Sequence, residues 1–233
     1  MTNHEHEENP SVDTPADAAA AGNNRRPGAL DGNEAVNLAA EQSKSTAHRN
    51  IPPLNLDELP VPDDTANLRH GPSLNDALLA LLPLVGVWRG EGQAIENGEE
   101  FAFGQQIIFA HDGEDYLTYE SRLWRLDENG QSTGPDQRET GFWRISARDE
   151  IEVITCLSTG AVEIMYGKPY NERAWEISSA STMVTEQGPK NLGPGKRLFG
   201  LMPNNNLGWV DERADDTGEL SPHLSAQLKR IAG

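Results

Sequence analysis

The sequence is short of three features, and each shortage excludes a class of protein. It has a single cysteine, Cys156, so no disulfide can form within the chain. It has no apolar run that could span a bilayer and no apolar segment near its start that resembles a secretion signal. The chain has 19 Lys and Arg against 37 Asp and Glu, and its basic residues form no cluster in the sequence. This composition disfavours nucleic acid and anionic membranes as partners. We therefore expect a cytoplasmic protein whose charge of −18 keeps it in solution.

Cys156 lies in the apolar run IEVITCL, which predicts a buried, unreactive thiol.

Aromatic residues are absent from the first part of the chain, since all fourteen Phe, Trp and Tyr lie at Trp88 or later. The early part also contains low-complexity runs such as ADAAAAGNN. A segment with so little bulky apolar content buries too little surface to offset the entropy of ordering it. We therefore predict a disordered acidic tail with a proline-rich linker over residues 1–66, and one folded domain over residues 67–233.

One short helix is predicted just before the first aromatic residue. Ser73 and Asp76 have the spacing of a capping box, and Pro83 limits extension at the other end. From position 74 onward apolar residues recur at helical spacing, at positions 74, 77, 78, 81 and 85. These residues indicate packing against a core.

From Gly86 onward the apolar pattern changes to a period of two, which is typical of strands. In EFAFGQQIIFA one set of alternating positions runs from Phe101 to Phe109, and similar short segments follow between turn-rich pieces such as AHDGED and DENGQSTGPDQ. The pattern predicts an all-β fold, a run of antiparallel strands that form a sandwich or a barrel. In the first strand, VGVWRGEG, alternation places Gly86, Trp88, Gly90 and Gly92 on one face. There, bare backbone permits close approach and the ring of Trp88 can plug one end.

Residues 74–233 resemble the nitrobindin family of haem-binding β-barrels, which are similar in shape to fatty-acid-binding proteins. The family's G-x-W-x-G-x-G signature is complete, at Gly86, Trp88, Gly90 and Gly92. Further matches follow in order along the chain, at Glu139, Gly141, Arg144, Gly160, Glu163, Gly167, His223, Leu224, Leu228 and Arg230.

The resemblance implies a compact antiparallel barrel of about ten strands. It implies one haem b per chain, held in a mouth of the barrel in the ferric state. It implies that His223 is the axial iron ligand and that Lys196 contacts the haem, with Lys190 and Arg197 as alternatives in the same segment. It implies isomerisation of peroxynitrite to nitrate and binding of nitric oxide, with no catalytic residue beyond the haem. A homodimer is compatible with this interpretation.

Histidine placement is consistent with that assignment. Of six histidines, three lie in the predicted tail and His70 lies at the domain edge. His111 precedes the turn sequence DGED, so we expect it at a strand end near solvent. His223 lies in the segment PHLSAQLKR, whose surroundings by themselves suggest an ordinary surface or capping histidine. Its role as iron ligand is what the resemblance implies.

Two other hypotheses remain open at the level of sequence. A haem-free barrel would carry a fatty acid or another apolar ligand, with Arg122, Arg144 or Tyr119 holding its carboxylate. A packed barrel without any ligand would act as an interaction module through its tail.

Overall fold

The computed structural model describes residues 31–50, 59–96, 98–189, 192–215 and 217–233. The chain forms two compact units, Met1–Glu58 and Leu59–Gly233. Among the helices of the described residues, none is long and apolar enough to cross a membrane.

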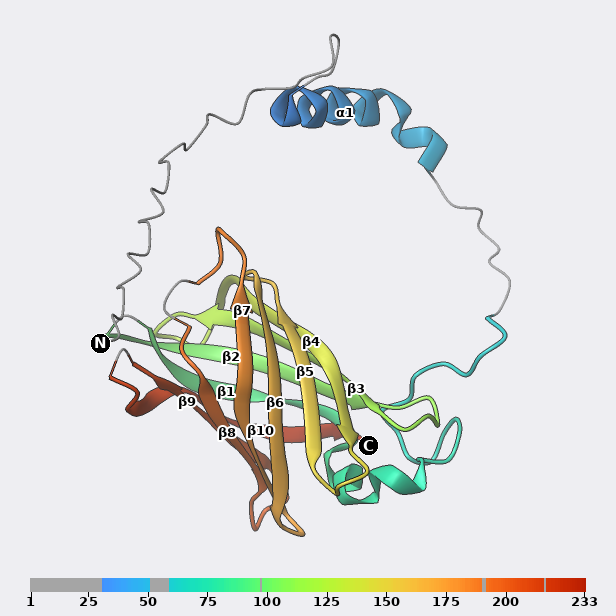
Figure 1. Ribbon diagram of the computed structural model, residues 1–233, viewed down its shortest axis with the longest axis vertical. Coiled ribbons are helices and arrows are strands. Elements are labelled where there is room, and N and C mark those ends of the chain that lie inside the picture. Colours follow the sequence, from blue (N-terminus) through green and yellow to red (C-terminus); the bar gives the residue numbers. More distant parts are fainter. Residues whose placement is uncertain (1–30, 51–58, 97, 190–191, 216) are drawn as a thin grey trace, which may run out of the picture. The chain divides into compact units, whose positions relative to one another are not determined.

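The second unit is a closed antiparallel barrel of ten strands (Figure 1). The alternating pattern predicted the antiparallel strands, and the family resemblance predicted the barrel. Each strand pairs with its neighbours in chain order, and β1 also pairs with β10 to close the barrel. The strands are β1 Gly86–Glu96, β2 Glu99–Ala110, β3 Leu117–Leu126, β4 Ser132–Ile145, β5 Ile151–Leu157, β6 Ala161–Asn171, β7 Ala174–Val184, β8 Gly195–Leu201, β9 Leu207–Ala214 and β10 Leu220–Ala232.

A 3₁₀ helix, η2 (Asp76–Leu84), packs against the barrel core at the predicted helix position. Its N-cap is Asn75, whose side chain accepts from the Ala77 N–H, and not Ser73 of the predicted capping box. Because a 3₁₀ helix has about three residues per turn, Leu78, Leu81 and Leu84 align on one side, and all three are fully buried. The spacing of these leucines thus matches the period of a 3₁₀ helix.

The glycine and tryptophan motif of β1 lies as predicted, with Trp88 fully buried. Its Nε1 donates to the Leu84 carbonyl at 2.8 Å, which ties the ring to η2. A Cβ on Gly90 would lie 2.1 Å from the Gln227 carbonyl oxygen, and one on Gly92 would lie 2.4 Å from the Phe103 ring. Bare backbone at these positions lets β10 and a core ring approach β1 closely.

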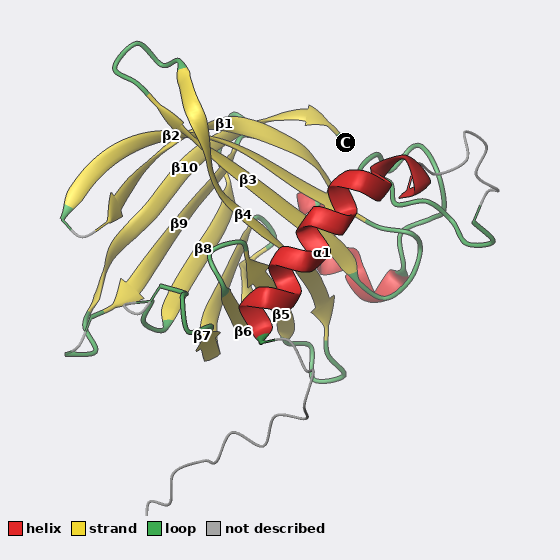
Figure 2. Cartoon of the chain, turned by 90° about the horizontal axis from the view of Figure 1, so that it is seen from above, coloured by secondary structure: helices red, strands yellow, loops and turns green. Residues whose placement is uncertain are grey.

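Part of the predicted tail has regular structure that composition alone did not indicate. Helix α1 (Gly32–Thr46) begins with a capping box formed by Asp31 and Glu34, and η1 (Ala47–Asn50) continues it (Figure 2). None of the residues of α1 is buried, so local capping and helix propensity account for the helix. Residues 1–30 and 51–58 of the predicted tail lie outside the described residues. The barrel unit begins at Leu59, earlier than the predicted boundary at residue 67.

The prediction of a buried thiol at Cys156 is wrong, because Cys156 is exposed. Strand β5 alternates strictly, and the inward positions are taken by Thr155 and Leu157. Parity within the strand, rather than the apolar character of the run, decides which way the thiol points.

Candidate functional site

A cluster of charged side chains lies inside the barrel. Each of its members is nine-tenths or more buried, and the cluster consists of Glu139 on β4, Glu163 on β6, Arg197 on β8, and Asp211 and Arg213 on β9. Burial of a charge is expensive unless it is paired, so the contacts within the cluster determine whether it is stable.

Both buried arginines are paired with carboxylates on two sides. Arg197 contacts Glu139 (Nη1 to Oε1, 2.7 Å) and Asp211 (Nε to Oδ1, 2.9 Å). Arg213 contacts Asp211 (Nε to Oδ2, 2.9 Å) and Glu163, which it grips with two nitrogens at 2.7 and 3.1 Å. The cluster thus contains two guanidinium groups and three carboxylates.

These contacts fix the protonation of the cluster. Burial by itself would raise the pKa of Asp211, but the charges of Arg197 and Arg213 hold that pKa well below its usual range. For Glu163 too, burial is outweighed by the contact with Arg213, and its pKa is lowered. Burial and the nearby Glu139 raise the pKa of Tyr119 well above its usual value, so its hydroxyl stays protonated and donates to Glu139 at 3.3 Å.

His223 lies at the edge of this cluster, where β10 is irregular. The pairing of β10 with β9 shifts register between Pro222 and Leu224, so His223 is an extra residue in the strand. A bulge of this kind can re-aim a side chain, and the His223 Nδ1 lies 2.7 Å from Asp211 Oδ2. The side chain is 27% exposed, while Asp211 beside it is fully buried.

A small pocket opens beside the imidazole of His223. It has a volume of about 270 Å³, and its other lining residues come from β1, β9 and β10, among them Ile95 and Leu224. The second ring nitrogen, Nε2, bonds to no side chain in the described part of the chain. An imidazole with one nitrogen held by a carboxylate and the other free is the arrangement that metal-binding histidines commonly show.

Lys196 lies on the outer face of β8, where its Nζ is 2.8 Å from Glu176 Oε2. The hydrogen bond with Glu176 raises the pKa of Lys196. Because side chains alternate along a strand, the next residue, Arg197, is the one that points into the barrel. The expected contact between Lys196 and a haem stays a prediction. Lys190, the other alternative, lies outside the described residues.

The expectation that His111 lies near solvent is wrong, because its side chain is fully buried. Residue Thr65 forms an isolated β-bridge with His111 and covers this strand end. Neither ring nitrogen of His111 has a hydrogen-bond partner in the described structure. Burial lowers the pKa of His111, and the charges of Asp112 and Asp64 offset only part of this effect. His48 and His70 are exposed.

The side chains proposed to hold a fatty-acid carboxylate are not suited to it. Those of Arg122 and Arg144 are exposed by about half and form ion pairs on the outer face. Tyr119 does face the interior, but its hydroxyl contacts Glu139. The buried arginines are already paired with carboxylates of the chain itself, so neither offers a free charge to such a ligand.

Two members of the cluster, Asp211 and Arg213, were missed at the level of sequence, and Arg197 was named only as an alternative haem contact. A signal was present, because Leu207, Trp209, Asp211 and Arg213 occupy alternate positions of one strand and the first two are core residues. Parity would therefore have placed the two charged residues inside the barrel.

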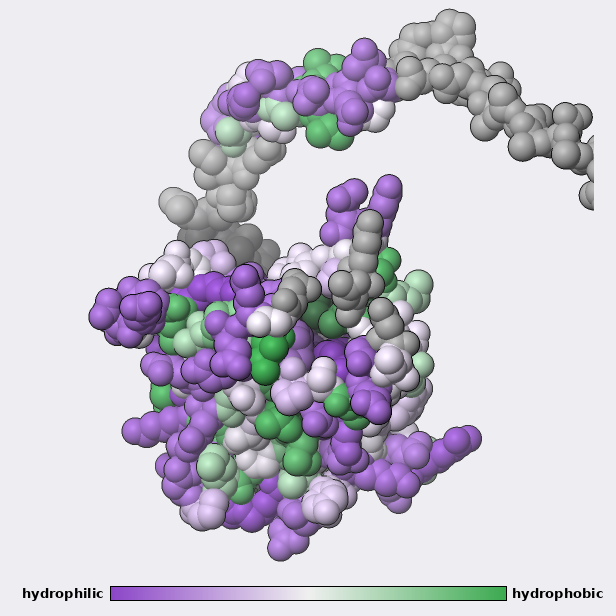
Figure 3. All heavy atoms as spheres, turned by 90° about the vertical axis from the view of Figure 1, so that its left-hand side faces the viewer, coloured by the Kyte–Doolittle hydropathy of each residue, from purple (hydrophilic) through white to green (hydrophobic). Residues whose placement is uncertain are grey.

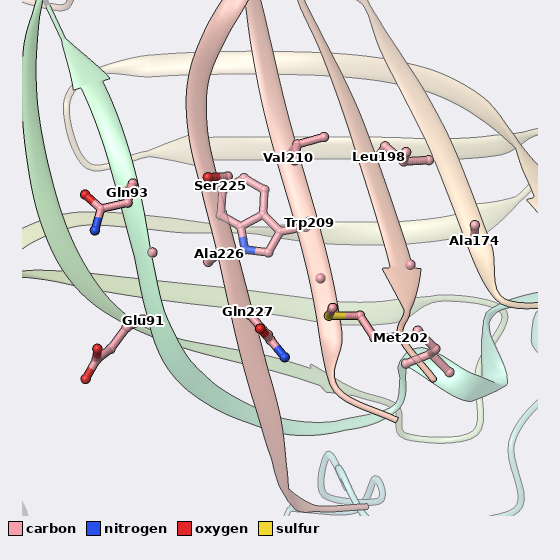
Figure 4. Close-up of a pocket in the computed structure, with 14 residues that line it drawn as sticks. Glu91, Gln93, Ala174, Leu198, Met202, Trp209, Val210, Ser225, Ala226 and Gln227 are labelled. Carbon is pink, nitrogen blue, oxygen red and sulfur yellow. The ribbon is translucent and has the colours of Figure 1, made fainter. Parts of the chain in front are cut away.

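A second, larger hollow lies mainly over the outer surface of β8, β9 and β10. It has a volume of about 570 Å³, and Leu198, Met202 and Val210 contribute apolar side chains to it (Figure 4). Figure 3 views the barrel from the side on which β8 and β9 lie and shows apolar residues gathered among hydrophilic ones. Glu91 is the only ionisable residue of its lining, so the hollow offers few groups for chemistry.

Residues 77–230 match a family model described as the THAP4-like, heme-binding beta-barrel domain. The chain belongs to this family. This finding confirms the predicted nitrobindin resemblance, and the charge cluster and His223 lie within the matched residues.

Named relatives support the same conclusion. The chain is 69% identical to a ferric nitrobindin-like protein of Corynebacterium diphtheriae, over 89% of this chain and 92% of the relative. It is 50% identical to peroxynitrite isomerase 1 of Mycobacterium marinum, over 87% of this chain and 93% of the relative. Among solved structures it is similar to Rv2717c of Mycobacterium tuberculosis, with 25% identity and a TM-score of 0.59, over 68% of this chain and 99% of that one.

Proposed function

We infer that this barrel binds one haem b, that His223 Nε2 is the axial ligand, and that the loaded protein isomerises peroxynitrite to nitrate and binds nitric oxide. The observation that carries the inference is the 2.7 Å contact between His223 Nδ1 and the buried carboxylate of Asp211. Membership of a haem-binding family and 50% identity to a protein named peroxynitrite isomerase 1 support it.

The residues present fit a haem ligated by one histidine. Such a histidine must be neutral, held in one orientation and free at the nitrogen that meets the iron. Asp211 supplies the acceptor for Nδ1, and the pocket beside the ring has apolar walls at Ile95 and Leu224. The described part of the chain holds no group of three or more clustered His, Cys, Asp or Glu residues that would suit a bare metal ion instead.

A haem bound by His223 would supply an iron able to take up a small anion or nitric oxide. The chain's own contribution is to bind and orient. The Asp211 carboxylate keeps the His223 ring from rotating. The ion pairs with Arg197 and Arg213 keep that carboxylate in its place beside the ring. No side chain at the site needs to donate or accept a proton for an isomerisation, because peroxynitrite and nitrate have the same atoms and charge.

The test is an absorbance titration of the purified full chain with hemin. The expected result is a saturable Soret band that His223→Ala abolishes, whereas His70→Ala, which removes an exposed histidine at the barrel's edge, leaves it intact. The loaded protein should then accelerate peroxynitrite decay beyond free hemin at equal concentration, and nitric oxide should shift the band. A Soret band indifferent to His223→Ala would refute the ligand assignment.

A further inference from the structure

Asp211 contacts both parts of the candidate site, the His223 ring and the buried charge cluster. We propose that Asp211 is a positioning residue whose carboxylate holds His223 in the tautomer with hydrogen on Nδ1, which leaves the lone pair on Nε2. The consequence for iron binding rests on the proposed function, whereas the tautomer is a property of the protein without any haem.

The chemistry of the contact dictates the tautomer. Asp211 is fully buried and accepts from the Nε of both Arg197 and Arg213, so it is an ionised carboxylate. An ionised carboxylate has lone pairs but no hydrogen, so it can only accept. The 2.7 Å contact therefore requires the hydrogen to lie on Nδ1 of His223, and in a neutral imidazole the other nitrogen then carries the lone pair.

The carboxylate is also fixed in direction. Arg197 holds Oδ1 at 2.9 Å, and Arg213 holds Oδ2 at 2.9 Å. Since each oxygen has its own guanidinium partner, rotation of the carboxylate would break two buried charged contacts. Glu139 and Glu163 hold the two arginines in turn.

The backbone brings His223 to this carboxylate through the bulge in β10. Ser221 pairs with Arg213 and Leu224 pairs with Asp211, which leaves His223 without a partner on β9. Pairing of β10 with β1 ends at Leu224 and Ala94, so His223 lies just beyond the closed part of the barrel. An unpaired residue at the rim combines access to solvent with a contact to the buried cluster.

Charge gives the same contact a second consequence. The cluster holds three carboxylates and two guanidinium groups, a surplus of one negative charge. The surplus favours positive charge at the nearby Nε2 position. Iron bound there should favour its ferric state over its ferrous state, because reduction by one electron lowers the positive charge. Replacement of Asp211 by a neutral residue should therefore raise the reduction potential of the bound iron.

The first experiment measures the tautomer in the full chain without haem, by ¹⁵N NMR of the histidine rings. His223→Gln identifies the resonances of His223 by their loss. We expect hydrogen on Nδ1 in the natural protein and a second tautomer in Asp211→Asn. Asp136→Asn on β4 is the matched control, since it breaks an Asp–Arg pair with the half-buried Arg125 on β3 and should leave the His223 resonances unchanged.

The second experiment measures hemin affinity and reduction potential in the same variants. Loss of an acceptor behind a ligating histidine costs about 10- to 100-fold in affinity for the metal group. Asp211→Asn should show that loss together with a raised potential, and Asp136→Asn should show neither. Circular dichroism checks that Asp211→Asn folds, and the tautomer of the natural protein does not depend on that variant.

The outcomes separate the two proposals. Hydrogen on Nε2 in the natural protein would overturn the positioning role whether or not haem binds. Hydrogen on Nδ1 without any His223-dependent Soret band would support the positioning role and overturn the haem function. An unchanged affinity and potential in folded Asp211→Asn would overturn the consequence for iron.

Discussion

The buried charge cluster predicts an asymmetry between two substitutions that each remove one of its charges. Arg197→Met replaces a side chain that is 3% exposed and contacts both Glu139 and Asp211. Glu139→Gln removes one carboxylate and keeps an oxygen that can accept from Arg197. The natural cluster has a charge of 2 − 3 = −1 from its guanidinium and carboxylate groups.

The two variants move this charge in opposite directions. Arg197→Met leaves one guanidinium for three carboxylates, a buried charge of 1 − 3 = −2. Breaking a buried pair in this way costs about 3–5 kcal/mol. Glu139→Gln leaves 2 − 2 = 0 and weakens one charged hydrogen bond, which is worth about 1.5–3 kcal/mol. Arg197→Met should therefore lower the free energy of unfolding more than Glu139→Gln does.

Urea denaturation followed by tryptophan fluorescence measures the free energy of unfolding of each variant. Arg122→Met serves as the control, because its ion pair lies on the outer face with the arginine 52% exposed, and such pairs contribute about 0–1 kcal/mol. The charge balance inferred for the cluster is wrong if Arg197→Met lowers the free energy of unfolding no more than the control does. It is also wrong if Glu139→Gln lowers that free energy more than Arg197→Met does.

Three further results are expected. The lowered pKa of His111 means that the folded state favours the neutral ring, so stability is present above the unfolded pKa of about 6.5 and is lost as pH falls below it. His111→Leu should flatten the pH dependence of urea midpoints between about pH 6.5 and 5, and an unchanged slope would contradict this. Gly90→Ala should lower the thermal midpoint of unfolding, because the new Cβ would lie 2.1 Å from the Gln227 carbonyl oxygen. Gly208→Ala should not, because its Cβ would have no atom closer than 3.5 Å. Equal losses in the two variants would exclude the steric explanation. The exposed Cys156 should react with a thiol reagent in the native protein as fast as after denaturation, and protection in the native state would contradict its outward position.

Much of the barrel could be predicted because its pattern is local. The alternation of apolar residues, the turn sequences between them and the glycines of β1 are each set within a few residues, and the strands follow them. The closing element with His223 could be identified because its matching residues lie close together in the sequence. The same local reasoning failed at Cys156 and at His111, where strand parity and a covering segment near Thr65 decide burial.

The sequence by itself determined an all-β barrel, a glycine-lined first strand and one candidate ligand histidine. Tertiary structure alone decided which side chains contact that histidine and which charges surround it. Arg197 and Glu139 lie 58 residues apart, and Arg213 and Glu163 lie 50 apart, so no local pattern relates them. Closure of the barrel brings their strands' inner faces together. Because the interior excludes water, each charge there must find its partner across the barrel, and His223 meets Asp211 only as a result.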